Sequence, residues 1–393
     1  MSKFNIVLTL FLLPLFARAS DTLGILQFQE IVLNNHPLIE SANLLDEVAE
    51  AYLLKGQGAL DPKLESDFDR KHFKEQNYFT RWNSEVKIPT RYPVDFSLGY
   101  ENNSGDFLND EAFLPNNGLL YGTINISVLR GLLFDEQRFA LQESRLLADK
   151  NEIEKDIIVR NVVIQALNSY IEWSAAFTEL QLVEEYLQRV TDRHKFIIQL
   201  FENGDKPAID TIESRINLNT ANKNKINATE KLLLKKQKLN MFIWNDSGEP
   251  MMILESVVPQ LIEEILSILE LEVAFINPSW NEDPLLRKIE NQTQMITLQN
   301  RLEREWLKPQ LDIKLNTIHS LGDNDLSYSY NVNDYKLGAS LEVPIRNRKT
   351  QGQLRLNEAM INQNILNQSY YSCLLYTSPS PRDQRGSRMP SSA

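Results

Sequence analysis

The residue types that most often carry chemistry in proteins are sparse and scattered in this chain. It has 393 residues with four histidines and one cysteine. The histidines, His36, His72, His194 and His319, share no metal-ligand spacing. The sequence contains no glycine-rich phosphate loop, G-x-S-x-G elbow or H-E-x-x-H pair. Carboxylates are plentiful, but they fall mostly on the polar faces of helical segments, as solvated charges do. The sequence therefore predicts a protein that is not an enzyme, with no catalytic residues, no metal and no cofactor.

Composition and charge narrow the function classes further. Hydrophobic residues make up 42% of the chain, and the formal net charge is −12. This apolar share is enough to build a packed structure, and the acidic balance argues against nucleic acid as a partner. The elements of the fold, rather than a reactive cluster, must therefore explain the function.

The N-terminus has the pattern of a secretory signal peptide. Lys3 precedes an apolar run over 4–16, and Ala17 and Ala19 occupy the two positions that signal peptidase reads. The run is too short to cross a bilayer as a helix, which needs about 20 residues. We expect cleavage after Ala19 and export of the chain; the alternative is a buried first helix.

The C-terminus differs from the rest of the chain. Residues 373–393 read CLLYTSPSPRDQRGSRMPSSA, with neither a helical nor an alternating period, and follow a helical pattern that ends near Ser372. The string resembles translated sequencing-adapter read-through, so we interpret it as a non-native tail. The alternative is an ordinary disordered tail.

An internal repeat organises the middle of the chain. Pro37 and Pro62 frame one helical stretch, and Pro284 and Pro309 frame another at the same spacing of 25 residues. Because proline is favoured in the first turn of a helix and excluded from its interior, each pair predicts a helix of matching length. After each helix the apolar period becomes alternating, as in a strand. Two copies of helix, strand, loop, strand and helix are therefore predicted.

The first copy continues into a very long helix. The 72 residues between Gly131 and Gly204 include no glycine or proline, and apolar residues recur at steps of three and four. A helix of this length needs neighbours in a bundle or coiled coil. Gly204 ends it, and Pro207 starts a return helix predicted over 208–243. A shorter helix is predicted over 259–275.

Alternating apolar and polar residues mark the strands of both copies. Such runs are the signature of outer-membrane barrel strands, whose apolar side chains face lipid, although a soluble half-buried sheet gives the same pattern. A long acidic loop over 101–118 and aromatic residues near the expected strand ends favour the membrane. These aromatic residues are Trp82, Tyr92, Tyr100 and Tyr121. The candidate lipid-facing residues are Ile124, Ile126, Val128, Leu311, Ile313, Leu315, Leu337 and Leu341.

Together these features resemble the TolC-like outer-membrane efflux proteins. The resemblance covers residues 24–372 and rests on the repeat and on a hairpin tip that reads Gly204-x-x-Pro207-Ala208-x-Asp210. The segments LRGLLFD at 129–135 and VPIR at 343–346 look like that family's strand-to-helix junctions.

The resemblance implies an α+β fold and a homotrimer in the cell outer membrane. Each protomer would lend strands to one shared, lipid-surrounded β-barrel, and its long antiparallel helices would continue as a periplasmic tunnel. The tip residues Gly204, Pro207, Ala208 and Asp210 would contact a periplasmic adaptor, and through it an inner-membrane pump. The implied function is a passive conduit for drugs, metals or polypeptides in tripartite efflux or type I secretion.

Two features depart from the family pattern. The second copy stops near Ser372, before the hairpin tip that would carry the tunnel gate, so we assign no gate residues. The first copy has 66 positions between its second framing proline and the end of its returning strand, against 34 in the second copy. The surplus contains strand-like runs over 78–88 and 94–100, which are either an additional hairpin or lengthened strands. The expected boundaries are a signal peptide at 1–19, a first repeat at 20–275, a partial second repeat at 276–372 and the tail at 373–393.

A second function class is a structural one. Periplasmic coiled-coil adaptors of export systems are also built on helical hairpins. An adaptor would require a lipoyl-like or barrel domain between the hairpin arms, and the sequence shows no candidate for one. Fractionation distinguishes the two hypotheses, because a channel needs detergent and an adaptor is recovered in water.

Overall fold

The structure is a computed structural model, and it describes residues 22–109, 112–115, 117–267, 283–320 and 333–377. The predicted signal cleavage site, with Ala17 and Ala19, lies outside these residues. The chain divides into two compact units. The first is made of residues 1–43 and 156–278, and the second of residues 44–155 and 279–393.

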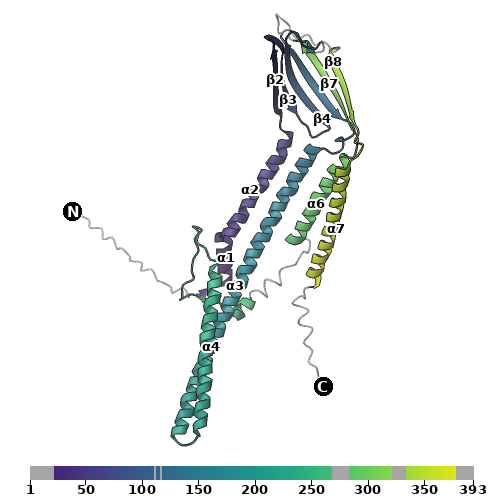
Figure 1. The fold of residues 1–393 in the computed structure, drawn as a ribbon. Coiled ribbons are helices and arrows are strands. Elements are labelled where there is room, and N and C mark those ends of the chain that lie inside the picture. The colour runs from purple at the N-terminus through teal and green to yellow at the C-terminus, as the bar shows by residue number, and fades with distance from the viewer. Residues whose placement is uncertain (1–21, 110–111, 116, 268–282, 321–332, 378–393) are drawn as a thin grey trace, which may run out of the picture. The chain divides into compact units, whose positions relative to one another are not determined.

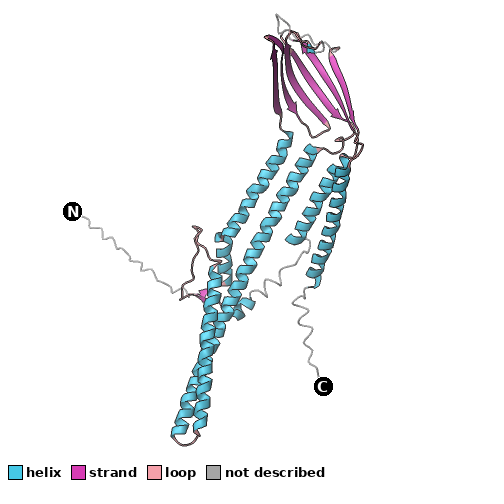
Figure 2. Ribbon diagram, in the orientation of Figure 1, coloured by secondary structure: helices cyan, strands magenta, loops and turns pink. Residues whose placement is uncertain are grey.

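Long helices and one large sheet make up the described residues, coloured by type in Figure 2. The helices are α1 (Ile25–Asn35), α2 (Pro37–Gln57), α3 (Glu136–Glu202), α4 (Ala208–Asn240), α6 (Pro284–Glu305) and α7 (Arg348–Thr377). The strands are β1 (Thr22–Leu23), β2 (Lys63–Phe73), β3 (Gln76–Ile88), β4 (Val94–Ser104), β5 (Leu119–Ser127), β6 (Val258–Pro259), β7 (Gln310–Ser320) and β8 (Tyr335–Glu342).

The large sheet lies in the second unit and contains, in the described residues, six strands in the order β2-β3-β4-β5-β7-β8 (Figure 1). Every neighbouring pair in it is antiparallel. The two copies of the repeat meet where β5 pairs with β7, with Ile124 opposite Leu315. Copy one therefore supplies β2 to β5, and copy two supplies β7 and β8.

The core of the first unit is an aromatic cluster between α1 and α3. Phe28 stacks on Tyr170 with ring centroids 5.3 Å apart, and Tyr170 meets the edge of Trp173 at 5.7 Å. The Tyr170 hydroxyl donates to the Leu23 carbonyl and accepts from the Gln260 amide at 3.1 Å. Burial raises the pKa of the Tyr170 hydroxyl. Because this hydroxyl ties β1 to the segment after β6, it fixes the loops that close this core.

The α3–α4 hairpin forms where the sequence predicts it. Helix α3 is continuous through 67 residues, in agreement with the stretch free of glycine and proline. Across the hairpin, Lys225 pairs with Glu184 at 3.1 Å, and both Lys235 and Lys238 pair with Glu172 at 3.0 Å. These two lysines hold the pKa of the Glu172 carboxyl below its usual range. These ion pairs link the two helices at several levels along the hairpin.

In the second unit, α6 and α7 pack against each other. Their contact includes a buried amide pair, in which Asn357 donates to Asn300 at 2.9 Å. Asn364 also donates to Thr293 at 3.1 Å. Such buried polar contacts restrict the register of a helix pair, because a slip would leave the amides unsatisfied.

Several predicted boundaries need correction. The surplus of copy one is an additional hairpin, β3–β4, and β4 continues through Ser104 into the stretch predicted as loop. Helix α4 ends at Asn240 rather than at 243. Helix α7 continues to Thr377, past the predicted end near Ser372. The segment predicted as a helix over 259–275 begins instead with β6, is helical over 262–267, and then leaves the described residues.

Candidate functional site: a two-faced sheet and a helical tip

The sheet of the second unit has one apolar and one polar face. The strand registers place Ile88, Phe96, Ile124, Leu315 and Leu337 directly opposite one another in successive strands. Adjacent side chains along a strand point to opposite faces. On the other face the same registers align Lys87, Ser97, Thr123, Asn316 and Lys336.

All eight candidate lipid-facing residues are consistent with this apolar face. Seven lie within β5, β7 and β8, and Val128 follows the end of β5 and donates its backbone N–H to the Leu311 carbonyl at 2.8 Å. The face is exposed to a degree that is unusual for apolar side chains: Leu98 is 63% exposed and Leu337 64%. An extended apolar surface of this kind marks contact with a membrane or another protein.

The aromatic residues do not all lie where the sequence predicts. Trp82 is in the middle of β3, and Tyr100 lies inside β4. The two rings meet edge to face at 5.7 Å on the apolar side. Tyr121 is on the polar side, where its hydroxyl donates to Asn83 at 2.8 Å. The predicted position near a strand end was therefore wrong for Trp82 and Tyr100, because β3 and β4 are longer than the alternating runs indicated. Tyr121 does lie near the start of β5, but on the polar face.

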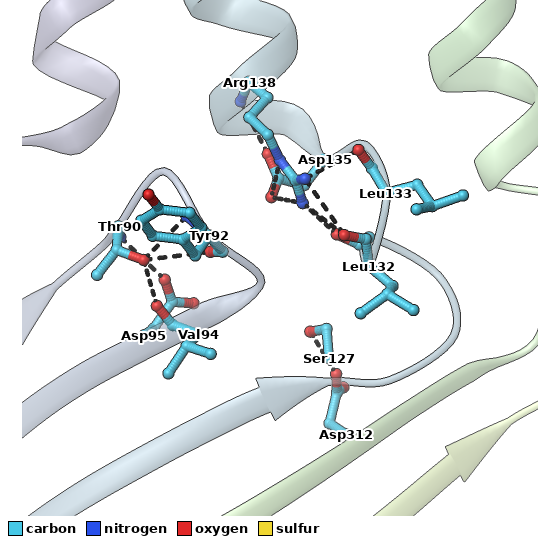
Figure 3. Close-up of polar contacts among 11 residues, drawn as sticks. Thr90, Tyr92, Val94, Asp95, Ser127, Leu132, Leu133, Asp135, Arg138 and Asp312 are labelled. Carbon is cyan, nitrogen blue, oxygen red and sulfur yellow. Dashed lines mark hydrogen bonds and ion pairs between the residues drawn. The ribbon is translucent and has the colours of Figure 1, made fainter.

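The junction between β5 and α3 is held by Arg138, a residue that the sequence analysis did not single out (Figure 3). Asp135 accepts from the Arg138 backbone N–H at 2.8 Å, as an N-terminal cap of α3, and its carboxylate also pairs with the guanidinium at 2.7 Å. The guanidinium donates in addition to the carbonyls of Gly131, Leu132 and Leu133. The Arg138 side chain thus binds both the carbonyl groups of the turn and the carboxylate that caps the start of α3. The signal for it was a capping Asp followed three residues later by Arg.

The predicted tip residues lie together in the turn between α3 and α4. Gly204 has φ of +84°, its N–H donates to Phe201, and the Asp205 N–H donates to Leu200 at 2.8 Å. These bonds are those of a Schellman ending, which favours glycine at this position. Pro207 precedes Ala208, the first residue of α4, and Asp210 pairs with Lys206 at 2.7 Å. The turn is compact and solvent-exposed.

None of the described helices is both long and apolar enough to cross a membrane. In the same part of the chain, no three His, Cys, Asp or Glu side chains gather as metal ligands would.

Comparison with known proteins identifies the fold. Neither the protein-family models nor the curated proteins give a match to this sequence. Among solved structures, the CmeC outer membrane channel of Campylobacter jejuni matches with a TM-score of 0.53 and 11% identity, over 90% of this chain and 68% of that one. The outer membrane protein VceC from Vibrio cholerae matches with a TM-score of 0.53 and 14% identity, over 88% and 75%. The open MtrE outer membrane channel of Neisseria gonorrhoeae matches with a TM-score of 0.51 and 12% identity, over 88% and 68%.

The chain therefore has the fold of the TolC-like outer-membrane channels. At these identities the likeness defines the fold, and the predicted resemblance is confirmed at that level.

Proposed function

We propose that the protein is an outer-membrane channel, a passive conduit through which an export system releases its cargo. The observation that carries the proposal is the two-faced sheet: an exposed apolar surface on one side, and a charged and amide-rich surface on the other, all strands antiparallel. Lipid on one side and a water-filled lumen on the other fit this sheet. The similarity in fold to solved outer membrane channels supports the same function.

We propose further that three copies form the channel, with the helices as a tunnel in the periplasm. Several apolar side chains of the hairpin are largely exposed in the described part of one chain: Leu182 is 62% exposed, Ile216 59% and Ile226 67%. A helix buries such a stripe only against other helices. Neighbouring copies arranged around an axis would cover these side chains and enclose a passage.

The hairpin tip is the proposed docking point for a periplasmic adaptor, which would link the channel to an inner-membrane pump. The cargo classes consistent with this role are drugs, metals and polypeptides. The alternative, a periplasmic coiled-coil adaptor, is less well supported, because its fold does not account for the exposed two-faced sheet or for the likeness to outer membrane channels.

Fractionation and conductance test the channel function. The full chain should be recovered with outer membranes, require detergent for extraction and run as a trimer that dissociates on heating. Inserted in a planar bilayer, the trimer should conduct ions. Recovery of a monomer from the periplasm without detergent would contradict the proposal.

The tip has its own test. Gly204→Val should cost about 1–2 kcal/mol locally, because only glycine adopts the left-handed backbone readily, and nothing lies within 4 Å of an added Cβ, so no steric clash contributes. Trimers should persist while efflux is lost. Gly352→Val is the matched control, since Gly352 also has open space around it but lies within α7. Normal efflux by the Gly204 variant would remove the tip from the docking surface.

A further inference from the structure

The two edges of the sheet are complementary in direction. In the described part of the chain, β2 and β8 pair on one side only, and every residue of both strands is exposed. With six antiparallel strands, β2 and β8 run in opposite directions. The β8 edge of one copy can therefore pair with the β2 edge of the next in the same antiparallel manner, and a ring of copies leaves no edge free.

From these edges we infer that the barrel has 18 strands, six from each of three protomers, and that Leu341 of one copy lies opposite Leu64 of the next. This inference rests on the proposed trimeric channel and specifies its barrel.

Charge selects this register among the neighbouring ones. With Leu64 opposite Leu341, the polar face brings Lys63 opposite Glu342 and Asp69 opposite Lys336. The described ion pairs within the chain do not involve any of these four residues. A slip of two residues in one direction would instead set Glu65 against Glu342 and Lys71 against Lys336. Like charges directly opposite each other destabilise a strand pair.

Barrel geometry excludes the slip in the other direction. Across one protomer, perpendicular to the strands, the residues that lie directly opposite one another in successive strands are Lys63, Lys87, Ser97, Thr123, Asn316 and Lys336. The next residue in the proposed register is Asp69 of the neighbouring copy, six residues beyond Lys63. Three such steps give a shear number of 18 for 18 strands, hence a strand tilt of about 35°. A slip to Asp67 gives about 25°, below the 35–45° range of closed barrels.

The strand number sets the width of the barrel. Eighteen strands at this tilt and at the usual strand spacing give a barrel of about 33 Å between opposite backbones, against about 22 Å for twelve strands. Barrels of 16–18 strands enclose an open aqueous channel. The barrel of this protein is accordingly wide enough to pass a polypeptide helix, whose diameter with side chains is about 10–12 Å.

Disulfide cross-linking tests the register in the full chain. Its single cysteine, Cys373, is first replaced by serine. Leu64→Cys with Leu341→Cys should then give covalent trimers on mild oxidation, because directly opposed residues bring Cβ atoms within disulfide reach. Ser66→Cys with Leu341→Cys reports the competing register and should cross-link at least 10-fold more slowly. Leu311→Cys with Leu341→Cys is the positive control within one chain, since these residues are opposed in the sheet.

Charge reversal gives an independent measurement. Asp69→Lys should lower the temperature at which the trimer dissociates, and Lys336→Asp in the same chain should restore it. Asp67→Lys is the matched control, because its proposed neighbour is Gly338, and Lys336→Asp should not restore that variant.

The outcomes separate this inference from the proposed function. Covalent trimers from the Leu64–Leu341 pair support the inference. Trimers that conduct but cross-link through the Ser66 pair, or through neither pair, overturn it and leave the channel function in place. The absence of any trimer in the membrane overturns the channel function itself.

Discussion

The two copies of the repeat use the same helical frame but build different amounts of sheet. Each begins with a helix whose first residue is proline, Pro37 in α2 and Pro284 in α6, and each enters a strand after its second proline. In the described residues, copy two supplies β7 and β8, and copy one supplies the corresponding β2 and β5 with the β3–β4 hairpin between them. Strands can therefore be added to this fold in pairs without disturbing the helices.

The pairwise addition has a physical reason. In the proposed channel, one extra strand would reverse the direction of the chain and send the following helix to the wrong side of the membrane. It would also make the edges of neighbouring protomers parallel. A hairpin preserves both the direction of the chain and the complementarity of the edges.

The largest expected effect comes from changing strand number. Deletion of residues 74–104 removes β3 and β4, makes copy one equivalent to copy two and should leave a trimer with a lower single-channel conductance, because the barrel narrows. Deletion of residues 63–75 removes β2 alone, leaves an odd number of strands and should abolish trimers. Heat-modifiable mobility and bilayer conductance report both. Stable trimers from the second deletion would contradict the argument from strand direction.

A glycine in each copy tests how tightly the polar face is packed. A Cβ at Gly99 would lie 2.2 Å from Cζ of Tyr121, whereas Gly338 in β8 has nothing within 4 Å. Gly99→Ala should therefore destabilise the protein by about 1–3 kcal/mol, partly through the Tyr121–Asn83 hydrogen bond. Gly338→Ala should be neutral or slightly stabilising. Denaturant unfolding gives both values, and equal effects would mean that the Tyr121 ring moves without cost.

The turn between β2 and β3 should be improvable. Lys74 and Glu75, which connect β2 to β3, both have positive φ, at 52° and 61°. Glycine is favoured at such positions, so Glu75→Gly should stabilise the β2–β3 hairpin by about 1 kcal/mol. Gln76→Gly is the control, because it lies in extended backbone at the start of β3 and should destabilise by about 0.5–1 kcal/mol. Unfolding midpoints of the two variants should move in opposite directions.

A small effect is expected at the residue that precedes the first framing proline of each copy. In copy one the Leu38 N–H donates to Nδ1 of His36 at 3.2 Å, and in copy two the Leu285 N–H donates to Asp283 at 2.9 Å. Burial holds the pKa of His36 below its usual value of 6.5. The folded state thus binds fewer protons than the unfolded state below pH 6.5, and stability of the first turn of α2 should fall as pH falls through that range.

Hydrogen exchange at the Leu38 amide measures this effect. Protection should decrease on acidification below pH 6.5 in the parent chain. His36→Asp gives copy one the cap of copy two and should remove this pH dependence, because its carboxylate accepts the same bond without titrating in that range. An unchanged pH profile in the variant would assign the effect to another group.

The elements that follow from local rules could be predicted from the sequence. The Pro-to-Pro spacing of 25 residues and the stretch free of glycine and proline predicted α2, α6 and α3. Gly204 predicted the end of α3, because a left-handed ending needs glycine. Alternation predicted which residues of a strand share a face, and the registers place the candidate residues of β5, β7 and β8 consistently with that.

The pairing partners of those elements could not be predicted from the sequence and follow from the three-dimensional packing of the chain. Alternation is the same in a lengthened strand and in an additional hairpin, so it could not separate β3 from β4; the pairing of Ile88 with Phe96 does. The hydrogen bonds of the Arg138 guanidinium depend on three carbonyl groups that come together only where the chain turns from β5 into α3. The charges on β2 and β8 can be interpreted only once the strand order is known, because that order places these two strands at opposite edges of one sheet. Local sequence patterns determine which side chains of a strand share a face, whereas the neighbours of each strand are set by the packing of the whole chain.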